Sequence, residues 1–371
     1  MFAPGLAERN AASRDGDRSF GKQLSEVSEG SAVVSKKEVL SKPVATIEVG
    51  KKSISGLLDE MSQTGFQGKK LGEVAKIWTE MAKQKGLTVF LGLTGSLSTT
   101  GQWKIIRWLV ENRYVDVVVS TGANISEDIL EALGYHYYQG TWLADDEALL
   151  RMKVDRFYDV YADEMQYRKL ERTIYSFANT LDPKKVYSTR EFLYQFGGYL
   201  NKKGIDSIVA AAHRAKVPMY SPGLIDSGYG VALSLLRREK GKMIRLDQTK
   251  DMEELAQIAE KTKRTGVVYL GGGVPKDTIQ LSTIIKSLSK GGEEETPHEY
   301  AIQITADSPQ WGGLSGCTLE EAISWGKIKS DAKKATLYAD ITLALPIVAH
   351  ALNEKTSGRS HPPDLSWVFK N

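Results

Sequence analysis

A lysine in the last sixth of the chain has the neighbours that covalent amine chemistry needs. Lys327 follows Trp325 by two residues and the carboxylate pair Glu320 and Glu321 by six or seven. A lysine desolvated beside an aromatic ring can attack an imine as a free amine, and carboxylates can hold a cationic substrate. An amphipathic helix that ends at Gly326, followed by a surface lysine, would give the same pattern. The segment therefore suggests amine chemistry and leaves a purely structural alternative open.

Three loops have the composition of phosphate-binding turns. The segment Thr94 to Gly101 is rich in glycine and hydroxyl side chains, and Gly271 to Gly273 is a run of three glycines after an apolar segment. Ser120 to Asp128 is the third. Such loops offer backbone N–H groups to an anion at a helix N-terminus, and glycine permits close approach. Neither GxGxxG nor GxxxxGK[ST] is present, so a tight turn without a ligand explains each loop equally well.

Three acidic residues in these and similar loops also have structural explanations. Asn124 and Glu127 have the spacing of a capping box, Asp226 lies in a Pro/Gly turn, and Asp340 could cap a helix. All of them follow predicted strands, so a parallel sheet would bring them to one edge. That shared location favours a common site.

Composition excludes several classes of function. The net charge of +3 and the lack of a basic tract with aromatic residues argue against nucleic-acid binding. A single cysteine and five scattered histidines predict neither a disulfide nor a metal centre. Neither a signal peptide nor a membrane-spanning run is apparent, so we expect a cytoplasmic protein that does not bind membranes.

Short apolar runs alternate with helical patterns from Pro43 onward, which predicts an α/β fold. A Rossmann-like, mainly parallel sheet with helices on both faces follows, in one large domain over residues 43–371. Residues 1–42 have mixed charge and no apolar period, so we expect a poorly ordered or arm-like extension. The expected strands are 86–92, 115–119, 217–220, 243–246, 266–270, 301–304 and 336–339. The expected helices are 103–112, one beginning near Ser126, 251–263 and 340–352.

Taken in order, these segments resemble deoxyhypusine synthase. The resemblance runs from about Pro43 to about Leu352 and includes Thr64-Gly65-Phe66-Gln67, the three loops above, and Ser221-Pro222 with Asp226. Its most specific parts are Ser324-Trp325-Gly326-Lys327 and Tyr338-Ala339-Asp340.

The resemblance implies an NAD-dependent aminoalkyl transferase of polyamine metabolism that forms homotetramers with active sites at subunit interfaces. Lys327 would carry the aminobutyl group as an imine, with Asp277 as a catalytic neighbour. Polyamine or diamine substrates would contact Glu127, Glu321, Trp325 and Trp311. NAD would contact Gly95, Ser96, Leu97, Ser98, Thr99, Thr121, Gly122, Ala123, Asp226, Gly272, Thr305, Ala306, Asp340 and Ile341.

Three departures from the family pattern concern the substrate. Asp277 stands where the resemblance expects a histidine, and Val231 and Leu314 stand where it expects acids. We therefore hypothesise that small amines are the substrates and that homospermidine or a related polyamine is the product. True deoxyhypusine synthase activity on a translation factor and an inactive regulatory subunit are the alternatives.

Overall fold

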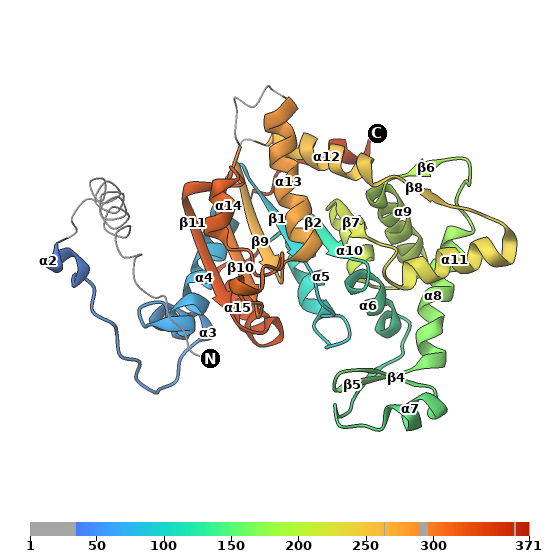
Figure 1. Cartoon of the computed structure of the whole chain (residues 1–371), viewed down its shortest axis with the longest axis horizontal. Coiled ribbons are helices and arrows are strands. Elements are labelled where there is room, and N and C mark those ends of the chain that lie inside the picture. The colour runs from blue at the N-terminus through green and yellow to red at the C-terminus, as the bar shows by residue number, and fades with distance from the viewer. Residues whose placement is uncertain (1–34, 263, 290–295, 360, 371) are drawn as a thin grey trace, which may run out of the picture. The chain divides into compact units, whose positions relative to one another are not determined.

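The computed structural model describes residues 35–262, 264–289, 296–359 and 361–370 (Figure 1). Contacts divide the chain into two units, Met1–Ala45 and Thr46–Asn371. Most of the predicted extension, residues 1–34, lies outside the described residues. Its described remainder contains the single-turn helix α2 (Lys36–Val39), which begins with a capping box formed by Ser35 and Glu38. None of the described helices is long and apolar enough to cross a membrane.

A six-stranded parallel sheet forms the centre of the unit Thr46–Asn371, as predicted. The strand order is β11-β10-β9-β1-β2-β7, and all the pairings are parallel. The chain builds outward from β1 in one direction and then from β9 in the other, which is the doubly wound order of Rossmann-like folds. The bounds are β1 (Leu87–Leu93), β2 (Val117–Thr121), β7 (Met219–Gly223), β9 (Arg264–Leu270), β10 (His298–Thr305) and β11 (Ile328–Tyr338).

Alternate residues of these strands pack on opposite faces of the sheet. One face packs with α4 (Phe66–Lys83), α5 (Trp103–Glu111) and α15 (Ile341–Lys355), through strand residues such as Val89, Leu91, Val268 and Ile302. The other packs with α12 (Gln248–Lys261), α13 (Gly273–Ser289) and α14 (Leu319–Ser324), through residues such as Phe90, Val119, Val267 and Ala301. Both faces are therefore apolar, which explains the unbroken apolar runs in the sequence.

A helical region lies beyond the β2 and β7 side of the sheet (Figure 1). It contains α6 (Asn124–Ala132), α8 (Glu164–Ala178), α9 (Thr189–Lys202), α10 (Ile208–Ala215) and α11 (Gly228–Lys240). The helix α3 (Ile54–Met61) is not part of this region and packs on α4 and α15. The strand expected at 243–246 is only β8 (Arg245–Leu246), which pairs with β6 (Val186–Tyr187) in a separate sheet.

A second sheet between α6 and α8 was not expected from the sequence. The strands β3 (Tyr137–Gln139), β4 (Val154–Phe157) and β5 (Val160–Asp163) pair antiparallel in the order β3-β5-β4. The helix α7 (Asp146–Met152) connects β3 to β4. The β4–β5 turn reaches the edge of the main sheet, and it enters the description of the site below.

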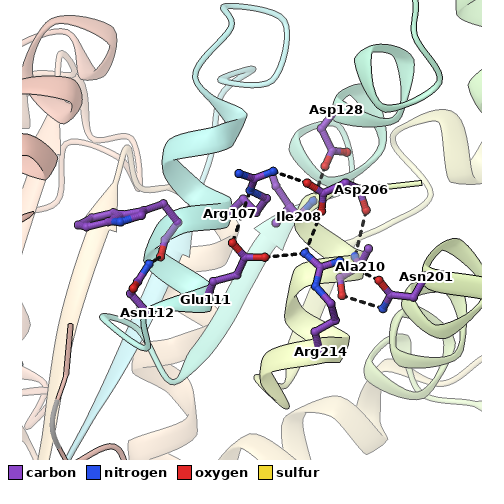
Figure 2. Close-up of polar contacts among 11 residues, drawn as sticks. Arg107, Glu111, Asn112, Asp128, Asn201, Asp206, Ile208, Ala210 and Arg214 are labelled. Atoms are coloured by element: carbon purple, nitrogen blue, oxygen red, sulfur yellow. Dashed lines mark hydrogen bonds and ion pairs between the residues drawn. The ribbon is translucent and has the colours of Figure 1, made fainter. Parts of the chain in front are cut away.

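A polar network fixes α10 against α5 and α6 (Figure 2). Arg214 on α10 bonds to Glu111 of α5 and to Asp206, and Arg107 of α5 also pairs with Asp206. Beside this network, the buried carboxylate of Asp128 on α6 accepts the backbone N–H of Ile208, the first residue of α10, at 2.6 Å. The helix that carries Glu127 is thereby held in place.

Candidate active site

Lys327 lies at the amino end of an edge strand. It follows α14, whose end is marked by Gly326 at φ 66°, and its N–H donates to the carbonyl of Ala322. Ile328, the next residue, pairs with His298 at the start of β10. The sequence predicted that the glycine-rich and acidic loops follow strands, at their carboxyl ends, and that Lys327 follows a helix. The backbone of Lys327 therefore lies at the edge of the sheet opposite to those loops.

The side chain of Lys327 is buried and paired with a carboxylate. Its Nζ lies 3.2 Å from Oδ1 of Asp277, in the second turn of α13, and 5.3 Å from the centre of the Trp325 ring. Lys327 is 9% exposed, so the alternative of a surface lysine after a capped helix is wrong. Trp325 is 63% exposed and shields the lysine on one side only. The structure therefore unites three of the residues assigned to the amine site.

A second buried lysine, which the sequence analysis did not single out, lies beside this group. The Nζ of Lys276 donates to Oε1 of Gln303 at 3.0 Å and to the carbonyl of Cys317, and burial lowers the pKa of Lys276. Gln303 in turn donates to the carbonyls of Gly271 and Ser315. This network ties the loop before α14 to the triple-glycine loop. Glu321 is exposed and lies near Lys276 and Cys317, within electrostatic reach of both.

A cavity of about 520 Å³ opens at the carboxyl edge of the main sheet. It lies where β1 and β9 end, the point at which the strand order reverses and where ligands bind in doubly wound folds. Eight residues assigned to NAD line it: Gly95, Ser96, Leu97, Thr99, Thr305, Ala306, Asp340 and Ile341. The remaining lining residues are Thr94, Thr100, Phe157, Tyr158, Asp159, Val160, Gly271 and Thr342.

The walls of this cavity fit a dinucleotide. A side chain at Gly271 (φ 84°) would place its Cβ 1.9 Å from Thr94 Oγ1, and one at Gly272 would meet Ser315 Cα at 2.4 Å. Gly271 therefore has no room for a side chain at the mouth of α13. The helices α5, α13 and α15 all begin at this edge, and their N-termini favour a pyrophosphate. Asp340 caps α15 through Thr342, as the sequence suggested.

Glu127 forms a separate part of the site. Its Oε2 accepts from the Ser96 hydroxyl at 2.7 Å, and Oε1 lies 3.5 Å from the Tyr167 hydroxyl. Burial raises the pKa of Glu127. The capping box with Asn124 is wrong, because the Asn124 amide instead accepts from Leu97 N–H and donates to the carbonyl of Gly95. Asn124 therefore braces the first glycine loop and leaves the Glu127 carboxyl facing it.

Several other assigned residues do not line the cavity. Ser98 is buried and donates to the Asn124 carbonyl. Thr121, Gly122 and Ala123 join β2 to α6, and Gly122 packs tightly against the loop that contains the exposed Asp226. Gly272 borders the cavity through its N–H, which donates to Thr94 Oγ1. Trp311 lies in a short 3₁₀ turn and is 74% exposed.

The described residues of one chain thus form a cavity and a buried lysine cluster that are distinct. Lys327, Asp277 and Trp325 do not line the cavity. No group of three potential metal ligands occurs among the described residues either. The architecture is that of a Rossmann-like protein with a cavity at its switch point and a separate buried lysine cluster, formed by residues of α13 and of the segment after α14.

Comparisons with known proteins agree with this class. The deoxyhypusine synthase family model matches residues 56–352. A probable deoxyhypusine synthase 2 of Methanosarcina mazei is 47% identical over 328 residues, which cover 88% of this chain and 94% of that protein. A deoxyhypusine synthase-like protein of Chlorobaculum parvum is 36% identical over 327 residues, 87% of this chain and 93% of that protein.

A solved structure shows the same fold. The crystal structure of a putative deoxyhypusine synthase from Entamoeba histolytica superposes with a TM-score of 0.57 at 17% identity, covering 84% of this chain and 96% of that one. The chain belongs to the deoxyhypusine synthase family. Members of this family are NAD-dependent aminobutyl transferases, and the resemblance found in the sequence is confirmed at that level.

Proposed function

We propose that this chain is an NAD-dependent aminobutyl transferase that acts on small amines and forms homospermidine or a related polyamine. The observation that supports it most is the buried Lys327 amine, 3.2 Å from the Asp277 carboxylate in a family of aminobutyl transferases. A buried lysine with a carboxylate beside it is equipped to form an imine.

Lys327 would act as the covalent carrier. Its Nζ bonds to the imine carbon of the oxidised amine, and the C–N bond to the departing amine breaks, so that the aminobutyl group stays on the lysine. Asp277 Oδ1 is placed to take the proton that the attacking amine loses and to return it to the departing nitrogen. An acceptor amine then reverses the same step and frees Lys327.

The charges near Lys327 suit a short cation. Asp277 and Glu321 can bind ammonium groups, and the exposed face of Trp325 can cover a cationic methylene chain. Val231 and Leu314 are 41% and 47% exposed and apolar at positions where the family resemblance expects acids. Fewer carboxylates favour a substrate with fewer ammonium groups, because each buried ammonium needs a partner.

The cavity at the switch point would hold NAD through the loops after β1, β9 and β11. Bound NAD would supply reversible hydride transfer, accepting a hydride from the donor amine and returning it to the product. Ser96 at one wall, with Glu127 bonded to its hydroxyl, can orient a polar group of the cofactor or an ammonium of the substrate. Thr305 and Asp340 lie at the other wall.

We propose further that the active site is shared between copies of the chain. Lys327 does not line the cavity of its own chain, although hydride transfer and imine exchange must reach the same carbon. Trp325 beside Lys327 is an exposed apolar side chain, as are Trp311 and Leu314 in the segment before α14, and such side chains suit contact with a second copy. A homotetramer built from such pairs is the proposed assembly, and two variants inactive for different reasons should complement each other.

The proposal is tested by incubating purified protein with NAD and putrescine, spermidine or agmatine, one or two at a time. Mass spectrometry should detect homospermidine or a related product from small amines alone. Transfer only to a lysine-bearing translation factor would contradict the small-amine proposal and support true deoxyhypusine synthase activity. A protein that binds no NAD and processes no amine would instead be a regulatory subunit.

The covalent step has its own test. Borohydride reduction during turnover should add the mass of one aminobutyl group to the wild type and none to Lys327→Arg. Lys329→Arg is the matched control, because Lys329 is exposed on the same strand and pairs with Asp331. Asp277→Asn should still be labelled, at least about tenfold more slowly, since it loses the proton acceptor. Equal labelling of Lys327→Arg and wild type would exclude Lys327 as the carrier.

A further inference from the structure

The turn between β4 and β5 lines the cavity, although it is not part of the main sheet or of the helices that begin at the edge of that sheet. Phe157, Tyr158, Asp159 and Val160 line the cavity opposite the loops after β1 and β11. This turn comes from the small antiparallel sheet beyond α6, outside the doubly wound core. Its presence at the cavity calls for a reason beyond the folding of the core.

The turn is held in a strained conformation. Tyr158 has φ 58°, in the left-handed region that bulky side chains rarely adopt. Such a conformation costs on the order of 1 kcal/mol or more, and it persists only where neighbouring groups enforce it. Residues of this kind gather at binding sites, so the strain directs attention to what Tyr158 faces.

Two hydrogen bonds enforce this conformation. Arg156 donates to the carbonyl of Tyr158 at 3.0 Å. Both carboxylate oxygens of Asp146 on α7 accept hydrogen bonds from the same guanidinium, at 2.6 and 2.7 Å. The N–H of Gly140 donates to the carbonyl of Asp159 at 2.8 Å. Both turn carbonyls are thus fixed from outside, while the Tyr158 side chain stays 66% exposed. The brace fixes the backbone and leaves the two side chains available to a ligand.

The charged side chains among the described residues of the cavity wall are all acidic. Among the described lining residues are two carboxylates, Asp159 and Asp340, and neither lysine nor arginine. Asp340 Oδ1 is occupied with capping α15. Within the described residues the Asp159 carboxylate makes no hydrogen bond to the protein. An unengaged carboxylate at the wall of a nucleotide cavity suits a ribose diol and repels a phosphate on that ribose.

We propose that the β4–β5 turn is a cofactor-selecting clamp, in which Asp159 binds ribose hydroxyls and the Tyr158 ring covers a flat face of the nucleotide. The clamp selects NAD over NADP, because the 2′-phosphate of NADP would meet Asp159 with no cation to balance it. This inference rests on the proposed function for the presence of a dinucleotide, and it adds the residues that choose which one.

Calorimetric titration of the full-length protein with NAD, NADP and ADP-ribose tests the clamp without any turnover. The wild type should bind NAD at least about tenfold more tightly than NADP. Asp159→Asn should reduce that preference by about tenfold, and Tyr158→Ala should weaken both NAD and ADP-ribose by about tenfold, with Tyr158→Phe close to wild type. Asp146→Asn, which loosens the brace, should shift binding in the same direction as Tyr158→Ala. Asp331→Asn, an exposed aspartate on β11, is the control and should change nothing.

The outcomes separate the clamp from the function. If the wild type binds NAD and neither Asp159→Asn nor Tyr158→Ala alters the affinity or the NAD preference, the clamp is wrong and the proposed function stands. Tighter binding of NADP than NAD by the wild type also contradicts the clamp. If the wild type binds no dinucleotide, both the clamp and the transferase proposal fail. Circular dichroism and thermal midpoints matching the wild type establish that the variants are folded.

Discussion

Asp128 should make the folded chain lose stability as the pH rises from about 4 to about 7. Its carboxyl group is fully buried on α6, where Oδ2 accepts the Ile208 N–H at 2.6 Å and Oδ1 has no partner among the described residues (Figure 2). Burial, with Glu127 and Asp206 as negative neighbours, raises the pKa of Asp128 from 3.8 to about 7. The folded chain therefore keeps a proton that the unfolded chain has already released.

The sign and size follow from proton linkage. Between pH 3.8 and 7 the folded state binds more protons than the unfolded state, so the free energy of unfolding falls with pH, and it levels off outside that window. The difference between about 7 and 3.8 corresponds to at most about 4 kcal/mol at 1.36 kcal/mol per pH unit. This is an appreciable part of the stability of a typical domain.

Urea unfolding of wild type and Asp128→Asn from pH 4 to pH 8 measures the effect. Asparagine keeps an acceptor for Ile208 N–H but cannot ionise, so the stability difference between the two proteins should change by up to about 4 kcal/mol in favour of the variant as the pH rises. Asp331→Asn, at an exposed ion pair, should show a constant difference. If the difference in free energy of unfolding between wild type and Asp128→Asn stays constant within about 0.5 kcal/mol from about pH 4 to about pH 8, Asp128 is ionised in the folded protein and our reasoning is wrong.

Two further predictions concern a buried charge and the shared site. Arg359→Met should destabilise the chain by up to about 3–5 kcal/mol in urea, because it removes one of the two arginine partners of the buried Asp116 and leaves only Arg113, and Arg359→Met/Asp116→Asn should recover part of the loss. Lys327→Arg and Gly271→Ala should each be inactive alone. When the two variants are co-expressed, half of the random pairs are mixed, and each mixed pair has one intact site out of two. The mixture should therefore regain roughly a quarter of wild-type activity. A mixture no more active than its components would show that each chain forms its own site.

The sequence predicted the central sheet well because its strands are buried on both faces. The inner strands read as apolar runs followed by a glycine or hydroxyl loop, as at Leu87–Leu93 and Arg264–Leu270. The edge strand β11 is largely exposed, and the sequence predicted only its last part. The antiparallel sheet β3–β5 gave no such signal. Its strands are three or four residues long and half-exposed, with Asp155 and Arg156 among them, so their apolar alternation is too short to detect.

The site was predicted in part, and the omissions have physical reasons. The loops after β1, β9, β10 and β11 converge on the cavity because they end parallel strands, which a strand pattern reveals. The β4–β5 turn reaches the same cavity through tertiary packing, which no local pattern encodes. The Asn124 capping box failed for a related reason, since the side chain bonds across to Gly95 and Leu97, and such long-range partners are invisible in the sequence.

The position of Lys327 links these observations. The motif that marks it is local, but its burial depends on Asp277 fifty residues earlier in the chain, on a helix that begins at the triple glycine. Gly272 lies against Ser315, and Lys276 and Gln303 bond to the same two loops, so the glycine loop at the cavity and the segment that leads to Lys327 share these contacts. The cavity and the lysine cluster are therefore connected by packing and hydrogen bonds within one chain, although Lys327 does not line the cavity.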